Sequence, residues 1–80
     1  MAKGTSHKRN EKAILTVANN MKKYRKEAKI TINELALKIG VDYSQIGRME
    51  RGVVNANISI LFDIADALGI KPNQLLETPE

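Results

Sequence analysis

Residues 31–52 read TINELALKIGVDYSQIGRMERG, and this stretch decides the fold. Thr31, followed three residues later by Glu34, has the form of a capping box, in which each side chain accepts a hydrogen bond from the other residue's backbone N–H. A helix therefore begins here. Gly40 is expected to end it, because glycine adopts a left-handed backbone at the least cost.

A second helix follows this turn almost at once. Asp42 is suited to its N-cap, and the helix is expected to run from residue 43 to about residue 51. Apolar residues of the two helices would pack against each other and fix the angle between them, namely Leu35, Ala36, Ile39, Val41, Ile46 and Met49. Two helices joined by such a tight glycine turn form a helix-turn-helix, here over residues 32–51.

Three more helices flank this pair. Residues 11–28 carry apolar side chains at three- and four-residue steps, which predicts one long amphipathic helix. Asn57 can cap a fourth helix that Gly69 closes, and Pro72 suits the first turn of a short fifth. The predicted fold class is all-α, with five short helices in a single domain over residues 11–80, preceded by a flexible basic arm over residues 1–10.

Composition narrows the possible functions. The chain has 80 residues, no Cys and one His, His7, so disulfides, thiolate zinc sites and a His-based metal site are not expected. An enzyme is disfavoured for the same reason, and no carboxylate pair is set in a plausible pocket. No cofactor or small-molecule substrate is evident. No apolar run approaches the roughly 18 to 20 residues that span a bilayer, and the first ten residues lack the apolar stretch of a signal peptide, so we expect a cytoplasmic protein without a membrane partner.

The net charge of +4 is unevenly distributed. Residues 1–52 carry 12 Lys and Arg against 5 Asp and Glu, which is +7, whereas residues 53–80 carry one Lys against 4 acids, which is −3. One face is therefore expected to meet a polyanion and another to meet something else. Charge alone does not choose between DNA, RNA and an anionic membrane.

The chain resembles the lambda-repressor-like domains of the phage Cro and repressor type. The resemblance is carried by Thr31 to Val41 as Thr-x-x-Glu-Leu-Ala-x-x-Ile-Gly-Val, by Ile46 to Gly52 as Ile-x-x-x-Glu-x-Gly, and by Ile64 to Ile70 with Leu75 and Leu76. It covers about residues 14–77. The short length is similar to that of stand-alone repressors and of restriction–modification controller proteins.

This resemblance implies a regulator that binds double-stranded DNA, with the helix over 43–51 in the major groove. Carried over by position, the base-reading residues are Tyr43, Ser44, Gln45 and Arg48, and Gln45 could instead lie close to the backbone. Arginine can bond guanine through two hydrogen bonds, and glutamine can pair with adenine. The expected phosphate contacts are Thr31, Ile32, Lys22, Arg51 and Asn55.

Two positions depart from the family pattern. Family members often carry glutamine where Ile32 stands, so here only backbone amides at that helix start could hold a phosphate. Gly47 lies inside the recognition helix, where glycine costs up to about 1 kcal/mol relative to alanine; it could permit close approach to DNA or simply be tolerated. Arg25 and Glu50 match positions that the family pairs as an internal, structural ion pair.

The sequence also predicts a homodimer. Ile70, Leu75 and Leu76 place large apolar side chains in the final segment, where a small domain has little core left to cover them, so we expect them to form an interface. Two recognition helices would then meet a palindromic site about one turn of roughly 34 Å apart. Other functions compatible with the same fold are an antitoxin and a protein-interaction module that does not read DNA. Operator sequence, repression or activation, any effector and the role of the arm stay open.

Overall fold

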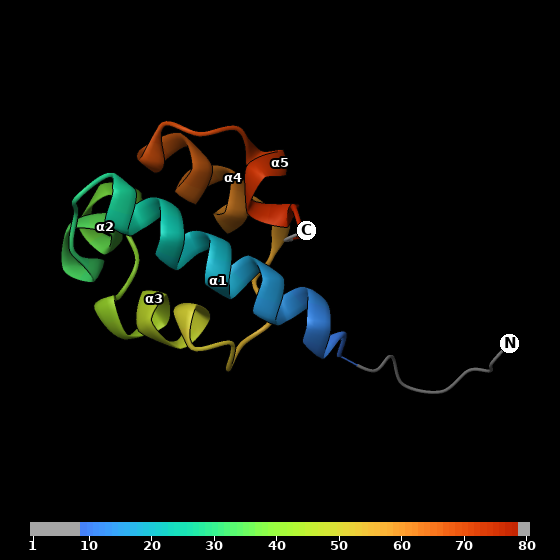
Figure 1. Ribbon diagram of the computed structural model, residues 1–80. Helices are drawn as coiled ribbons and strands as arrows, with labels where there is room; N and C mark the ends of the chain where they lie inside the picture. Colours follow the sequence, from blue (N-terminus) through green and yellow to red (C-terminus); the bar gives the residue numbers. More distant parts are fainter. Residues whose placement is uncertain (1–8, 79–80) are drawn as a thin grey trace, which may run out of the picture.

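The computed structural model describes residues 9–78, and these residues form five α-helices and no strand (Figure 1). No helix among them is long and apolar enough to cross a membrane. The predicted all-α, five-helix architecture is confirmed. Residues 1–8, most of the expected basic arm, lie outside the described residues. The helices in chain order are α1 (Glu11–Glu27), α2 (Ile32–Ile39), α3 (Tyr43–Glu50), α4 (Ile58–Leu68) and α5 (Pro72–Leu76).

Most helix ends are held by the residues that the sequence indicates. The Thr31 hydroxyl accepts from the Glu34 N–H at 3.0 Å and the Glu34 carboxylate accepts from the Thr31 N–H at 2.7 Å, so the capping box at the start of α2 is complete. Gly40 ends α2 in the left-handed region with φ of 75°. Asn57 caps α4 by accepting from the Ile60 N–H at 2.9 Å. The residues that the sequence indicates as caps of α2 and α4 therefore do cap these helices.

The start of α3 differs from expectation in one respect. Asp42 occupies the N-cap position with an extended backbone, but its side chain makes no capping hydrogen bond. The Asp42 carbonyl instead accepts from the N–H groups of Gln45 and Ile46, at 3.0 and 3.3 Å. The helix is therefore started by backbone bonds and by packing rather than by a side-chain cap, and the Asp42 side chain stays exposed.

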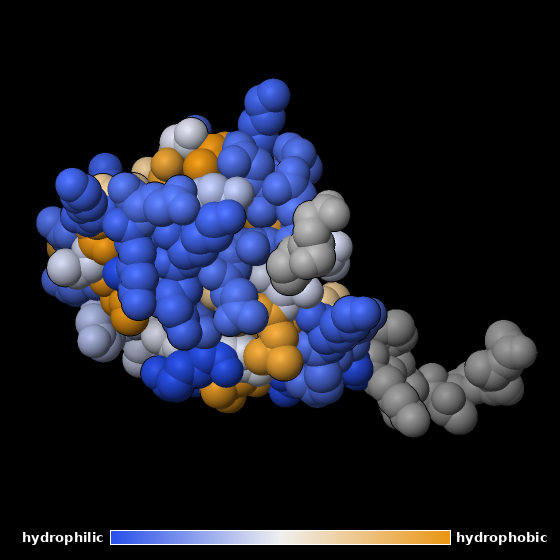
Figure 2. All heavy atoms as spheres, viewed as in Figure 1, coloured by the Kyte–Doolittle hydropathy of each residue, from blue (hydrophilic) through white to orange (hydrophobic). Residues whose placement is uncertain are grey.

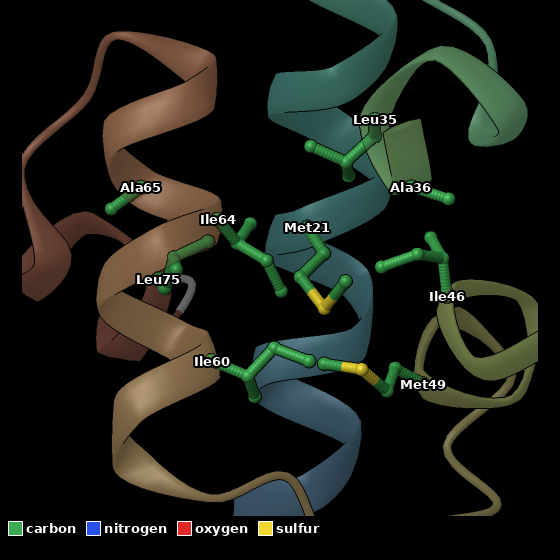
Figure 3. Packing of buried hydrophobic residues seen from close by; sticks show 9 residues of the cluster. All are labelled: Met21, Leu35, Ala36, Ile46, Met49, Ile60, Ile64, Ala65 and Leu75. Carbon is green, nitrogen blue, oxygen red and sulfur yellow. The ribbon is translucent and has the colours of Figure 1, made fainter. Parts of the chain in front are cut away.

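The core lies between α1 and the other four helices (Figure 3). Met21 of α1 is completely buried and stands in the middle, with the side chains of α4 on one side and those of α3 on the other. Because every helix contributes to this one cluster, the angle between α2 and α3 is fixed by the whole domain. The cluster consists of Met21, Leu35, Ala36, Ile46, Met49, Ile60, Ile64, Ala65 and Leu75.

The burial of Leu75 corrects one prediction. Leu75 is 0% exposed and belongs to the subunit's own core, so it is not available for contact with another subunit. The Asn20 side chain holds this end of α5 against α1 by donating to the carbonyls of Leu75 and Glu77, at 2.9 and 2.8 Å. Of the other two expected interface residues, Ile70 is half-buried and Leu76 is exposed.

Lys29 strains the turn between α1 and α2. Its φ of 61° makes it the one non-glycine residue within residues 9–78 that has a left-handed backbone. The strain is held in place because the Lys29 and Ile30 N–H groups donate back to the carbonyls of Lys26 and Arg25. This hydrogen-bonding pattern commonly ends a helix with glycine.

We expect Lys29→Gly to raise the free energy of unfolding by roughly 1 kcal/mol, since a left-handed backbone costs a residue with a Cβ roughly 1–2 kcal/mol and glycine's greater freedom in the unfolded chain offsets part of the gain. Lys29→Ala is the control, because it removes the same charge and keeps the Cβ. Urea unfolding followed by circular dichroism measures both variants. Equal stabilities of the two variants would contradict the strain argument.

Candidate nucleic-acid interface

The exposed face of α3 is polar and carries no carboxylate. Ser44, Arg48 and Arg51 are exposed and recur at four- and three-residue steps, so they form one stripe along the helix. The opposite face is buried, with Ile46 at 0% and Met49 at 4% exposure. A helix anchored on one side with two guanidinium groups on the other offers hydrogen-bond donors of fixed spacing to a polyanion.

An ion pair between α1 and α3 fixes the orientation of this face. The Arg25 Nε and Nη2 atoms donate to the two carboxylate oxygens of Glu50 at 2.6 and 3.0 Å. The Arg25 Nη1 atom also donates to the Ile30 carbonyl at 2.8 Å, which ties the α1–α2 turn to the same group. The side chains are only 12% and 4% exposed. The predicted internal pairing of Arg25 with Glu50 therefore exists, and both residues point away from the exposed stripe.

The electrostatics of this pair favour the charged form of Arg25. The hydrogen bond to Glu50 raises the pKa of the Arg25 guanidinium above its ordinary value, although burial acts in the opposite direction. Tyr43 makes a smaller contribution that also raises this pKa, so its ring lies within electrostatic reach of Arg25. Tyr43 is 58% exposed in the first turn of α3, next to Ser44 in the chain.

A cleft of about 200 Å³ lies between α3 and the start of α4, lined equally by polar and apolar residues; we call it the polar cleft after its four hydrogen-bonding side chains. Its hydrogen-bonding side chains come from two elements: Gln45 and Arg48 from α3, and Asn55 and Asn57 from the loop that leads to α4. The Asn57 side-chain oxygen caps α4, which leaves its amide N–H groups as donors. The structure thus brings together two predicted base-reading residues with the predicted phosphate contact Asn55. Asn57 joins them, and its role as a helix cap had hidden it in the sequence.

The other expected phosphate contacts lie outside this cleft. Thr31 and Ile32 are at the start of α2, where the Thr31 N–H is already taken by Glu34. Within the described residues the N–H groups of Ile32 and Asn33 have no acceptor, as is usual in the first turn of a helix. The exposed Asn33 side chain stands one residue beyond the position where the family often carries glutamine.

The α1 surface is strongly hydrophilic. Figure 2 shows that blue side chains cover most of the face over α1, with apolar atoms confined to small separate areas. Lys22 is half-buried on this helix, and Lys23 lies 5.0 Å over the ring of Tyr24. The lysines of α1 therefore place positive charge on this helix, outside the exposed stripe of α3.

The structure shows which neighbour the absence of a side chain at Gly47 accommodates, which the sequence did not indicate. Gly47 is buried. A Cβ at this position would stand 3.2 Å from the Nη1 atom of Arg51, closer than ordinary contact. Glycine therefore leaves room for the Arg51 guanidinium in the position that the structure gives it.

Arg9 also belongs to this region, although the sequence did not indicate it. Its guanidinium donates to the carbonyls of Val53 and Gly52 at 3.1 and 3.4 Å, just beyond the C-terminal end of α3, and it pairs with Glu11. Asn10 caps α1 by accepting from the Ala13 N–H at 2.9 Å. The folded part of the chain thus begins before residue 11, and its first residues lie beside the loop that follows α3. A lone arginine in a basic segment gives no sequence signal of such a contact.

Comparison with protein families now identifies the domain. The family model described as helix-turn-helix, HTH_3, matches residues 21–75, which is more than half of the chain. The chain belongs to the HTH_3 helix-turn-helix family. The predicted resemblance to Cro- and repressor-type domains is confirmed. A comparison with curated protein sequences finds no match.

Solved structures of similar fold agree with this assignment. A hypothetical transcription factor from Neisseria superposes with a TM-score of 0.81 and 29% identity, over 94% of this chain and 87% of that one. The restriction–modification controller protein C.AhdI from Aeromonas hydrophila gives 0.75 and 27%, over 78% and 94%. An HTH_3 family transcriptional regulator from Vibrio cholerae gives 0.79 and 25%, over 84% of this chain but only 38% of its own.

Removing Arg25 alone is expected to be more harmful than removing both members of the ion pair. Arg25→Met leaves the Glu50 carboxylate buried without its partner, which typically costs 3–5 kcal/mol of stability. In the double variant Arg25→Met/Glu50→Leu no buried charge remains, so its free energy of unfolding should exceed that of Arg25→Met. Urea unfolding of both single variants and the double variant completes the cycle. Strictly additive losses would show that the two side chains act independently.

Proposed function

We propose that this protein is a cytoplasmic, sequence-specific DNA-binding transcription regulator that inserts α3 into the major groove. The observation that carries the proposal is the Ser44–Arg48–Arg51 stripe, which is exposed and free of carboxylates on a helix whose opposite face is held by the core and by Glu50. Membership of the HTH_3 family and the regulators among its structural relatives support the same reading. A stripe with this chemistry matches the acceptor-rich edge of guanine and the phosphate backbone.

The side chains have distinct proposed roles. Arg48 reads guanine through two hydrogen bonds, and Gln45 at the edge of the stripe pairs with adenine or donates to the backbone. Ser44 and Tyr43, near the start of α3, donate to acceptors at the groove floor or to phosphate. These roles require the N-terminal half of α3 to enter the groove most deeply, as recognition helices commonly do.

The phosphate contacts surround this helix. Arg51 and Lys22 supply charge, Asn55 donates from the loop before α4, and the N–H groups at the start of α2, next to Thr31 and Ile32, donate from a helix N-terminus. Such contacts fix the register of the protein on the duplex without reading sequence. Because Ile32 has no polar atom in its side chain, we expect Asn33 to take part at that end.

Arg48→Ala and Lys22→Ala should separate the two kinds of contact. Arg48→Ala is expected to cost about 1 to 3 kcal/mol of discrimination against the cognate base pair in each half-site, because its hydrogen bonds go to one base. Lys22→Ala should weaken cognate and random duplexes equally and reduce the slope of log affinity against log salt by about one. Fluorescence anisotropy titrations at several salt concentrations measure both. If Arg48→Ala weakens both duplexes equally, Arg48 contacts phosphate only.

We further propose that the protein binds a palindromic operator as a homodimer. Three exposed apolar side chains support this, Ile58 at 67%, Phe62 at 56% and Leu76 at 55% exposure. Ile58 and Phe62 are four residues apart on α4, which carries no Lys or Arg, and α5 packs against α4. The exposed apolar start of α4, a helix without Lys or Arg, can meet its own copy without the repulsion that the basic α1 and α3 faces would create.

This surface replaces the one expected from the sequence. Leu76 stays in it and half-buried Ile70 lies at the far end of α4, but the buried Leu75 is exchanged for Ile58 and Phe62. The loop after α3 leads directly into the start of α4. A two-fold axis near Phe62 would therefore bring the C-terminal ends of both α3 helices toward the centre of the operator.

Phe62→Lys is expected to raise the dissociation constant of the dimer at least about tenfold, since a large aromatic at the centre of an interface is a typical hot spot. Leu37→Lys is the matched control, because Leu37 is even more exposed, at 73%, but lies on α2. Sedimentation equilibrium at micromolar concentrations measures both. A wild-type monomer that binds a single half-site as tightly as the full palindrome would contradict the dimer.

A further inference from the structure

A second, apolar cleft lies on the inner side of the loop between α3 and α4. It has a volume of about 150 Å³, and Met21 and Met49 lie at its inner end, where they are 0% and 4% exposed. Half-buried Val17 of α1, Val54 of the loop and Leu61 of α4 form its walls. Polar side chains line it only at Asn10 and Asn55, and no charged side chain lines it. A cleft of this kind exposes apolar surface to water that a ligand could cover.

The same loop separates this apolar cleft from the polar cleft of the candidate interface. Residues 54–56 and Met49 line both, with Gln45, Arg48 and Asn57 on the polar side only. The loop has no regular secondary structure. The loop therefore borders both clefts, and the proposed phosphate contact Asn55 lines each of them.

The volume and lining define the class of ligand. Apolar cavities of about 150 Å³ hold a molecule the size of benzene. Thioether side chains adapt to such guests because methionine is unbranched and polarisable, and they make favourable contacts with aromatic rings. With asparagine side chains only at the rim, the cleft suits an uncharged single aromatic ring, with at most one polar substituent directed outward.

We propose that this cleft binds a small, uncharged aromatic ligand and that its occupancy weakens operator binding. A ring seated among Val17, Val54 and Leu61 presses on residues 54–56 and displaces Asn55 relative to Arg48. DNA and ligand then favour different positions of one loop, and by linkage each lowers the affinity of the other by the same factor. The regulatory part rests on the proposed DNA-binding function, whereas ligand binding itself does not.

The test titrates full-length protein with benzene and with indole, and follows the methyl resonances of Met21 and Met49 by NMR. Saturable shifts of both methyl groups are expected. A parallel titration of the protein–operator complex by fluorescence anisotropy is expected to show that saturating ligand lowers operator affinity roughly fivefold or more. The DNA affinity of the ligand-free protein is measured first, so that failure of DNA binding is seen separately from failure of ligand binding.

Two α1 variants provide the matched comparison. Ala13→Leu extends a side chain into the cleft from an exposed position that lines it and should abolish the methyl shifts and the further loss of operator affinity on adding ligand. Thr16→Leu adds a leucine one turn away, outside the cleft, and should preserve both. Thermal unfolding of the two variants verifies that each is folded.

Three results would overturn the proposal. The first is an absence of methyl shifts in the wild-type protein. The second is saturable binding that leaves operator affinity unchanged. The third is ligand binding that disappears as the protein concentration rises through the dimer dissociation constant, which would assign the cleft to a side chain of a second copy.

Discussion

The structure depends on the way α1 holds α3 by two kinds of contact. The Arg25–Glu50 ion pair, with both carboxylate oxygens engaged, sets the rotation of α3 about its own axis. Met21, completely buried among the side chains of α3 and α4, sets its depth. Since the charged groups are almost fully desolvated, their value lies in specifying one orientation as much as in stability. Turning α3 by one residue would bury Arg48 or expose Met49.

This anchoring leaves different surfaces of a very small domain for different partners. The exposed side of α3 is polar and cationic, and the face over α1 shown in Figure 2 is largely hydrophilic. The start of α4 and the end of α5 expose Ile58, Phe62 and Leu76 instead. The loop of residues 51–57 joins the two regions, so the proposed operator contact, the proposed subunit contact and the apolar cleft all adjoin one short, irregular segment.

The sequence predicted the features that depend on interactions between residues close together in the chain. The capping box at Thr31, the left-handed Gly40 and the caps of α4 follow from rules that act over three or four residues, and the pattern of apolar spacing located all five helices. The pairing of Arg25 with Glu50 came from family resemblance, because nothing local links residues 25 positions apart. The predictions that were wrong or missing concern residues whose environment is set by three-dimensional packing. Adjacent Leu75 and Leu76 look alike in sequence, yet α5 turns one into the core and the other to the surface. The roles of Arg9, Gly47 and Asn57 likewise depend on neighbours distant in the chain or on a neighbouring turn of helix.

The most direct test of the account is selection of bound duplexes from a pool of random DNA by the full-length protein, followed by sequencing. The account predicts enrichment of an inverted repeat whose half-sites are centred about one helical turn apart, roughly 10 base pairs, with a guanine at a fixed position in each half. Enrichment of no common sequence, or of a single unpaired half-site, would contradict recognition by two α3 helices related by a two-fold axis.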